Sequence, residues 1–200
     1  MKLAVDSETR EDLILDAADR LLARYGYKKM TVEDVANEAG IGKGTVYLHF
    51  RSKEEVVLSH VDRIVRRLLE QLEAIAADSD TAAGRVREML LLRVMFRFDA
   101  VQHYTQSISE VLRDLRSGLL DRRQRHFDRE AKVLAAVLKE GDRSGELRCS
   151  DPLPTARVLI VATNSLLPFS LSTAELGKRR DVEAHATRIA ELLVGGLRRN

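Results

Sequence analysis

The segment 43–49, with the sequence KGTVYLH, carries a lysine, a hydroxyl, a phenol and an imidazole within two helical turns. These groups can donate hydrogen bonds to phosphate oxygens or to the edges of bases in a nucleic acid. Gly44 has no side chain, so the backbone could approach a duplex closely there. The pattern favours nucleic-acid recognition, and the alternative is an ordinary surface helix with some exposed aromatic groups.

The residues around this segment predict two short helices joined by a tight turn. Thr31 and Asp34 have the spacing of a capping box at a helix start. Apolar residues then recur at helical spacing, namely Val32, Val35, Ala36 and Ala39. Gly40 stands where a residue with positive φ would end this helix, and a second helix is expected over 43–50. Two short helices across such a turn are typical of a helix-turn-helix, whose second helix lies in the DNA major groove.

The glycines of the turn also suggest a phosphate-binding loop, but their spacing excludes one. A P-loop has the pattern Gly-x-x-x-x-Gly-Lys-Ser/Thr after a strand. If Gly42 and Lys43 were the Gly-Lys pair, Asn37 would replace the first glycine and Gly44 the final hydroxyl residue. The preceding segment is also expected to be helical, so we reject a nucleotide site.

The stretch from Thr31 to Glu55 closely resembles the DNA-binding signature of the TetR (TetR/AcrR) family of bacterial transcriptional repressors. The matching segments are Thr31–Val32, Asp34–Val35–Ala36, Ala39–Gly40–Ile41, Lys43–Gly44–Thr45–Val46–Tyr47, His49–Phe50 and Ser52–Lys53–Glu54. Gly42 departs from the pattern, because the family usually has a serine or threonine there that caps the recognition helix and contacts phosphate. Glycine is nearly as good a cap, so we expect the helix to persist and one phosphate contact to be lost.

The resemblance implies a role for each residue of the motif. Phosphate contacts are expected from Thr31, Tyr47 and Lys53. Base contacts are expected from Lys43, Thr45 and Leu48. The complete candidate DNA-binding set is Thr31, Gly42, Lys43, Gly44, Thr45, Tyr47, Leu48, His49 and Lys53.

Composition limits the class of protein without identifying it. The chain of 200 residues is 44% hydrophobic and 32% charged, which is typical of a globular protein. The net charge of +2 does not itself argue for DNA binding, and the first 53 residues carry nine basic and nine acidic residues, so their balance is zero. Phosphate neutralisation would depend on the local cluster Lys28, Lys29, Lys43, Arg51 and Lys53.

The single cysteine, Cys149, excludes an internal disulfide and a cysteine-rich zinc site. Neither a signal-peptide pattern nor an apolar run of membrane-spanning length is visible. We therefore expect a cytoplasmic protein that has no membrane partner and needs no cofactor.

The remaining sequence predicts an all-α fold with about nine helices. Besides the two short helices, the expected segments are 9–25, 52–77, 81–99, 103–116, 118–140, 153–172 and 181–198, with a loose tail over 1–8 and a loop over 141–154. Segment 81–99 is apolar nearly all round, which predicts a central buried helix. We expect a DNA-binding domain over 1–53 and a helical regulatory and dimerisation domain over 54–200, joined through the unbroken helix 52–77.

Several charged residues of the second domain allow two interpretations. Arg93 and Arg97 lie one turn apart in the buried helix, and they either extend to solvent, which we favour, or line a cavity and bind an anion. The basic run from Arg122 to Arg129 is interpreted as a solvated face whose acidic partners include Glu130.

The predicted function is that of a homodimeric, ligand-responsive repressor that binds a palindromic operator and is released by a small, largely apolar effector with one polar end. Candidate effector contacts are Met89, Met95, Phe96, Phe98, His103, Tyr104, Thr163 and Asn164. The last two helices resemble the pair that forms the dimer interface of the family, and its candidate contacts are Leu159, Ile160, Ile189 and Leu193.

Two other classes of protein were considered. A helical-bundle enzyme would need a feature such as paired Glu-x-x-His motifs or a nucleophile with its base. No Glu-x-x-His occurs in the chain, so we expect no enzymatic activity. A helix-turn-helix that contacts only proteins remains the other alternative, and salt-dependent DNA binding would distinguish it.

Overall fold

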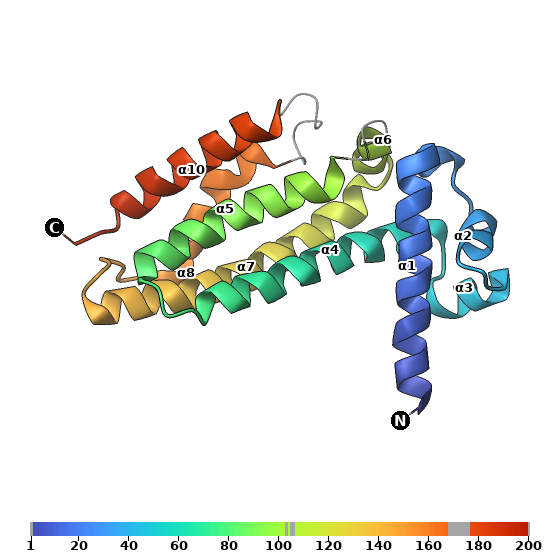
Figure 1. Ribbon diagram of the computed structural model, residues 1–200, viewed down its shortest axis with the longest axis horizontal. Coiled ribbons are helices and arrows are strands. Elements are labelled where there is room, and N and C mark those ends of the chain that lie inside the picture. The colour runs from blue at the N-terminus through green and yellow to red at the C-terminus, as the bar shows by residue number, and fades with distance from the viewer. Residues whose placement is uncertain (1, 103, 105–106, 168–176, 200) are drawn as a thin grey trace. The chain divides into compact units, whose positions relative to one another are not determined.

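The computed structural model describes residues 2–102, 104, 107–167 and 177–199, and it is helical throughout these ranges apart from turns and one isolated β-bridge between Leu147 and Arg198 (Figure 1). The helices of the described residues are α1 Lys2–Lys29, α2 Val32–Glu38, α3 Lys43–His49, α4 Lys53–Ala76, α5 Ala82–Val101, α6 Ser107–Asp114, α7 Arg116–Ser144, α8 Pro152–Thr163, the 3₁₀ helix η1 Asn164–Leu166 and α10 Arg179–Gly195. The prediction of an all-α fold with about nine helices is confirmed.

The chain divides into two compact units. Unit 1 comprises Met1–Ile64 and His103–Leu120, and unit 2 comprises Val65–Gln102 and Asp121–Asn200. Helices α4 and α7 each contribute residues to both units.

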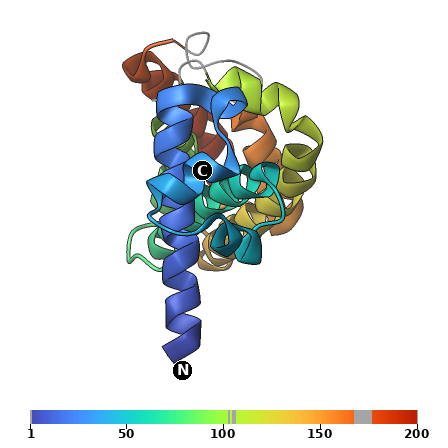
Figure 2. The same cartoon turned by 90° about the vertical axis from the view of Figure 1, so that its right-hand side faces the viewer.

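Unit 1 is built on α1, with α2 and α3 along one side of it (Figures 1 and 2). Gly26 interrupts α1 with a φ of 78°, directly after the predicted end of this helix at residue 25, and one further turn follows to Lys29. The helix begins at Lys2, so residues 2–8, which we expected to form a loose tail, are helical. The apolar stripe of α1 is buried, and its members include Ile14, Ala17, Ala18, Leu21 and Leu22. The buried apolar residues of α2, α3 and the start of α4 include Val35, Ala36, Val46, Phe50, Val56 and Val57.

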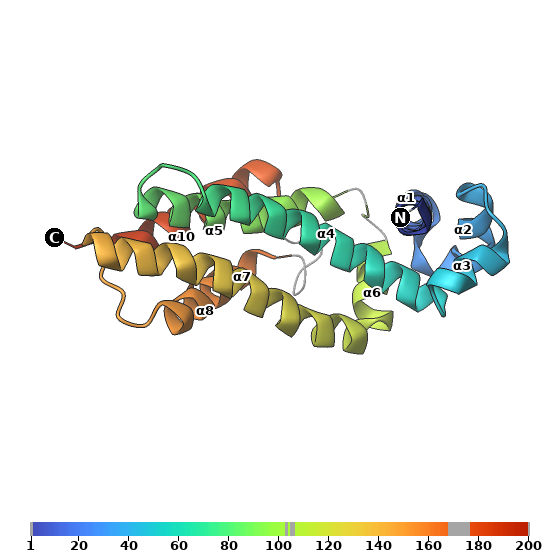
Figure 3. The same cartoon turned by 90° about the horizontal axis from the view of Figure 1, so that it is seen from below.

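The other helices of unit 2 pack around α5, which contacts α8 and α10 (Figure 3). The prediction that this helix is central and buried is confirmed, because eleven of its residues are buried. Its first half packs in the main core with α4, α7, α8 and α10. Its second half packs in a smaller cluster with Leu167 and with Val182 and Ala186 of α10.

The start of α5 is capped by a distant carboxylate. The backbone amides of Ala82 and Ala83 donate to the two carboxylate oxygens of Glu146, each at 2.9 Å. These amides have no partner within the helix, so Glu146 links the start of α5 to the turn that follows α7. This turn begins at Gly145, which has a φ of 78°, rather than at residue 141 as expected.

Helix α8 is shorter than predicted. It ends at Thr163 and continues as η1 to Leu166, whereas we expected a helix to residue 172. Pro168, which falls within the predicted segment 153–172 and would shorten or kink a helix there, lies outside the described residues.

Candidate nucleic-acid interface

The start of α2 is a complete capping box. The amide of Asp34 donates to the hydroxyl of Thr31 at 3.1 Å, and the amide and hydroxyl of Thr31 donate to the carboxylate of Asp34 at 2.9 and 2.7 Å. The hydrogen bonds from the Thr31 side chain and backbone lower the pKa of the Asp34 carboxyl group. In this arrangement both donors of Thr31 are engaged within the box, so a phosphate contact by its hydroxyl requires the hydroxyl to turn outward.

The turn between α2 and α3 depends on glycine at one position. Gly40 has a φ of 68°, which is in the left-handed region that side chains disfavour. Gly42 is the N-cap of α3 and has ordinary extended angles, with φ −71° and ψ 144°, and no side-chain cap. A Cβ atom added at Gly44 would meet nothing within 4 Å, so the surface of α3 is open at that point.

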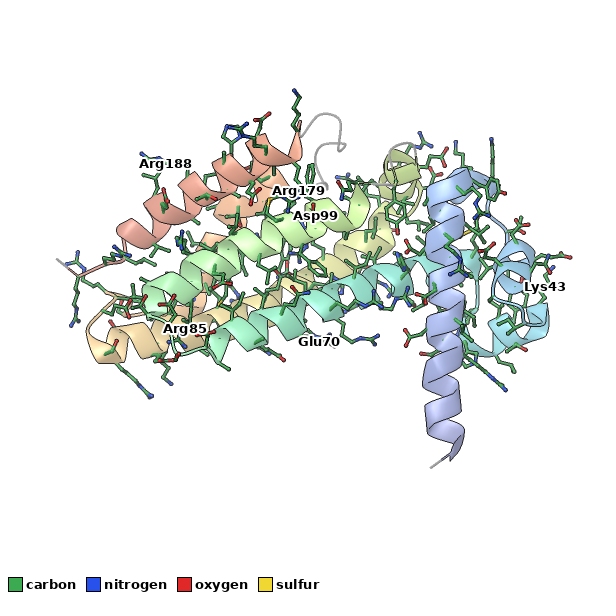
Figure 4. The ribbon with its side chains drawn as sticks, viewed as in Figure 1. Lys43, Glu70, Arg85, Asp99, Arg179 and Arg188 are labelled. Atoms are coloured by element: carbon green, nitrogen blue, oxygen red, sulfur yellow. The ribbon has the colours of Figure 1, made fainter. Side chains whose placement is uncertain are left out.

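Helix α3 buries one side and exposes the other. Val46 is fully buried and Phe50 is 6% exposed, so both face the core of unit 1. Tyr47 is 49% exposed and Leu48 is 83% exposed. Lys43 extends from the start of α3, where Figure 4 labels it, and Thr45 is partly buried. The exposed side of α3 therefore presents a cation, a phenol and an isolated apolar group.

The charged members of the candidate set have partners within unit 1. The Lys43 ammonium group lies 3.2 Å from the Glu33 carboxylate, and both side chains are exposed, so exchanging this partner for a phosphate would cost little. The Lys53 ammonium group donates to the backbone oxygen of Tyr27 at 3.0 Å and lies over the ring of that tyrosine. Lys43 is therefore more accessible to DNA than Lys53.

His49 is covered more than the sequence indicates. Its side chain is only 13% exposed, and Nδ1 lies 3.4 Å from a carboxylate oxygen of Glu11 on α1. The ring therefore packs against α1, whereas Tyr47 and Leu48 face outward.

Replacing Gly42 by serine is expected to stabilise the protein. The backbone angles suit any residue, and a Cβ atom there would meet only the Thr45 hydroxyl, at an ordinary 3.8 Å. The serine would restrict the unfolded chain and cap α3, which together are worth about 0.5–1 kcal/mol. We expect the midpoint of thermal unfolding to rise by about 1–4 °C. The matched change Gly40→Ser should lower the midpoint, because residue 40 has a positive φ that serine disfavours. Equal shifts of the midpoint in the two variants would contradict this explanation.

The candidate effector residues fall into different environments. Met89 lies in the main core of unit 2, with Phe96 packed against it, and Met95 and Phe98 lie in the smaller cluster. Thr163 and Asn164 both accept hydrogen bonds from Arg93. His103 lies outside the described residues.

Tyr104 belongs to unit 1, where its hydroxyl donates to Asp19 and lies 2.9 Å from His60 Nε2. His60 is itself buried, with only 4% of its surface exposed. The structure therefore does not bring Tyr104 into one unit with Met89, Met95 and Phe98.

A small void of about 10 Å³ lies in the main core of unit 2. Its lining residues are Leu72, Met89, Leu90, Arg93, Glu130, Leu134 and Ile160, and the surface that they present to the void is almost entirely apolar. This volume is enough for about one water molecule.

The expectation that Arg93 and Arg97 extend to solvent is wrong, because they are only 2% and 5% exposed. Glu130, which we assigned to a solvated face, is 2% exposed and lies between them. Arg93 Nε donates to Glu130 Oε2 at 3.1 Å, and Arg97 Nη2 donates to Oε1. Burial raises the pKa of Glu130, but Arg97 and Arg93 outweigh it and hold the pKa below its usual value. The long stems of the arginines extend towards this carboxylate instead of towards water.

Two of the four candidate dimer contacts need correction. Leu159 and Ile160 are 3% and 2% exposed and pack in the main core of the same chain, so they do not form an outer face. Ile189 and Leu193 are half-buried. The exposed apolar residues of these helices are Val158 and Val161 on α8 and Leu192 on α10, with exposed fractions of 64%, 66% and 62%.

Within the described residues, every helix is either too short or too polar to cross a lipid bilayer.

A capped helix, a glycine turn and a second short helix with an open outer face define a helix-turn-helix, and this places the chain in the class of DNA-binding regulators. Residues 14–59 match the family model described as bacterial regulatory proteins of the tetR family. The chain belongs to the TetR family of bacterial transcriptional regulators.

Similar proteins support this assignment over most of the chain. The fatty acid metabolism regulator protein of Bacillus subtilis (strain 168) is 27% identical over 188 residues, which cover 92% of this chain and 93% of that protein. The HTH-type transcriptional repressor KstR2 of Mycolicibacterium smegmatis is 30% identical over 145 residues, covering 70% of this chain and 68% of the repressor. A crystal structure of a putative TetR-family transcriptional regulator from Mesorhizobium loti has the same fold, with a TM-score of 0.74 at 18% identity over 96% of this chain and 98% of that one.

Proposed function

We propose that the protein is a homodimeric, cytoplasmic repressor that binds a palindromic operator through α3 and is released by a small, largely apolar effector. Residues 1–53 would bind DNA, and residues 54–200 would bind the effector and form the dimer. The observation that carries the proposal is the open outer side of α3, with Tyr47 49% and Leu48 83% exposed over a buried Val46.

The exposed groups of α3 suit a DNA major groove. The Tyr47 hydroxyl can donate to a phosphate, and the Lys43 ammonium group can reach a base edge or a phosphate. Leu48 has no hydrogen-bonding group, so it can contact only apolar parts of a base such as the thymine methyl group. Thr45 would add a hydroxyl, and Gly44 would permit a close approach of the backbone.

A dimer is proposed because one short helix reads only a few base pairs. Two copies related by a two-fold axis would read two half-sites of a palindrome. The surface that we assign to the interface is the exposed apolar set Val158, Val161 and Leu192, which would otherwise face water.

Release by an effector is supported by the names of two similar proteins and by the continuity of α4. One relative is a regulator of fatty acid metabolism and another is a repressor. Helix α4 runs without a break from Lys53, next to the helix-turn-helix, to Ala76, and its Leu72 lines the void in unit 2. An effector that binds the non-DNA form more tightly would weaken DNA binding, and DNA would weaken effector binding by the same factor.

The DNA contact can be tested with an operator selected from a randomised library and measured by fluorescence anisotropy. Tyr47→Ala is expected to weaken binding about tenfold or more, because it removes a hydrogen bond to a charged phosphate. Lys43→Ala should reduce the slope of log affinity against log salt by about one. The control Tyr25→Ala removes a phenol that is 53% exposed on α1 and should leave affinity unchanged. Unchanged affinity in Tyr47→Ala and in Lys53→Ala would refute the assignment.

A further inference from the structure

The three carboxylates of α2 have different partners. Asp34 completes the capping box at the start of the helix. Glu38 lies 2.6 Å from the guanidinium group of Arg20 on α1. Glu33 lies 3.2 Å from the ammonium group of Lys43, the first residue of α3 (Figure 4). Glu33 is therefore the carboxylate of α2 that pairs with the helix expected to enter the major groove.

Local stability does not account for the pair of Glu33 and Lys43. An acidic residue in the first turn of a helix suits the helix dipole, but Asp34 already supplies a carboxylate there. A lysine at the start of α3 has the unfavourable sign for the dipole of that helix. The side chains of Glu33 and Lys43 are 67% and 52% exposed, and an ion pair in water contributes little to folding. The pair is better explained by what it presents to a ligand.

The pair presents a donor and an acceptor side by side. Lys43 Nζ carries three hydrogens and donates one of them to Glu33, so two remain for other acceptors. The Glu33 carboxylate has further lone pairs that can accept from another donor. Lys43 lies at the N-terminal end of α3, and this end of a recognition helix contacts the base edges in helix-turn-helix complexes.

The major-groove edge of a G·C base pair has the complementary order of groups. Guanine offers the acceptors N7 and O6 next to each other, and the N4 amino group of cytosine offers a donor beside O6. O6 and N4 are joined by a pairing hydrogen bond, so they lie about 2.9 Å apart, close to the 3.2 Å between Lys43 and Glu33. In an A·T pair the two acceptors lie on either side of the donor, so a single ammonium group does not reach both.

We propose that Glu33 and Lys43 together read one G·C base pair in each half-site of the operator. Lys43 donates to N7 and O6 of guanine, and Glu33 accepts from N4 of cytosine while it holds the lysine in place. A carboxylate repels phosphates, so Glu33 suits a base contact and not a backbone contact. The inference rests on the proposed function, and it deepens that function by assigning a base pair and adding Glu33 to the residues that determine specificity.

The test measures base preference on the full-length protein. Fluorescence anisotropy gives affinities for the selected operator and for duplexes in which each half-site position carries every base pair in turn. The wild type should prefer G·C at one position by about tenfold or more. Lys43→Ala should identify this position by removing its preference. Glu33→Ala should reduce the same preference by about fivefold or more and leave the other positions unchanged.

Glu38→Ala is the matched control, because it removes a carboxylate from the same helix whose partner is Arg20 on α1. It should leave the preference at every position unchanged. Loss of charge alone would change the affinity for all sequences by the same factor, since their phosphates are alike. A Glu33→Ala protein that behaves in this way would overturn the inference. So would a preference for any base other than guanine at the position that depends on Lys43.

A modified operator tests the same contact with the wild-type protein, whether or not the variants fold. N4-methylcytosine opposite the guanine keeps the hydrogen used in pairing and replaces the one that faces the major groove by a methyl group. It should weaken wild-type binding by about tenfold, because a hydrogen bond to a charged group is lost. It should not weaken binding by Glu33→Ala, and equal weakening in both proteins would contradict the contact.

The two levels of the argument fail in different ways. A protein that binds its operator through Lys43, but in which neither Glu33→Ala nor N4-methylcytosine has the expected effect, would lose this inference and keep the proposed function. A protein that selects no sequence from the library would lose the proposed function itself.

Discussion

Replacing Glu130 by glutamine is expected to lower the free energy of unfolding by about 3–5 kcal/mol, as is usual when one partner of a buried ion pair is removed. Glutamine has nearly the same shape, but it removes the negative charge that two buried guanidinium groups share. Both groups come from α5, which packs in both apolar clusters of unit 2. Urea unfolding at neutral pH, followed by circular dichroism, measures the difference.

The matched control is Asp128→Asn, two residues earlier on α7. Asp128 pairs with Arg157 at 3.1 Å, and both side chains are well exposed, so its removal should cost less than about 1 kcal/mol. Similar losses of unfolding free energy in the two variants would show that burial does not increase the contribution of the Glu130 ion pair to stability.

The cost of Glu130→Gln should also depend on pH. The folded protein holds the pKa of Glu130 below its usual value, so the stability that this carboxylate contributes is present above the pKa of the unfolded chain. It is lost as the pH falls through the lower pKa of the folded state. The wild type and Glu130→Gln should therefore converge in stability under acid conditions, and a constant difference would contradict the assigned charge.

Replacing Val161 by aspartate is expected to convert the protein to a monomer and to weaken operator binding by about 100-fold or more, because the two half-sites would no longer be bound together. Val161 is 66% exposed in α8, so the change should leave the chain folded. At the centre of a symmetric apolar interface, however, it would bury two unpaired carboxylates. Sedimentation velocity at micromolar concentration gives the oligomeric state, and fluorescence anisotropy gives the affinity.

The same substitution at Leu120 serves as the control. Leu120 is an apolar residue of α7 that is 45% exposed and lies outside α8 and α10. Leu120→Asp should remain a dimer and should bind the operator normally. A monomeric wild type, or a Val161→Asp variant that stays dimeric, would contradict the proposed interface.

The sequence by itself determined the helix-turn-helix, because each of its signals acts over a few residues. The capping box of Thr31 and Asp34 formed as predicted, and Gly40 adopted the positive φ that ends α2. The division of α3 into a buried Val46 and an exposed Tyr47 also followed from helical periodicity. The buried character of α5 was predictable for a similar reason, since its apolar residues surround the whole helix.

Tertiary structure alone decided which side chains meet across long sequence distances. The sequence shows Arg93 and Arg97 on an apolar helix and Glu130 in a basic run, but no local pattern indicates that α5 and α7 bring them together. On α8, apolar residues occupy two sides of the helix. Whether Leu159 or Val158 faces inward depends on packing against α5 and α10. The position of His49 beside Glu11 of α1 also depends on how the helices pack. Helical periodicity specifies the side of a helix on which each residue lies. The packing of whole helices decides which of two apolar sides faces the core, and which partner a buried charge meets.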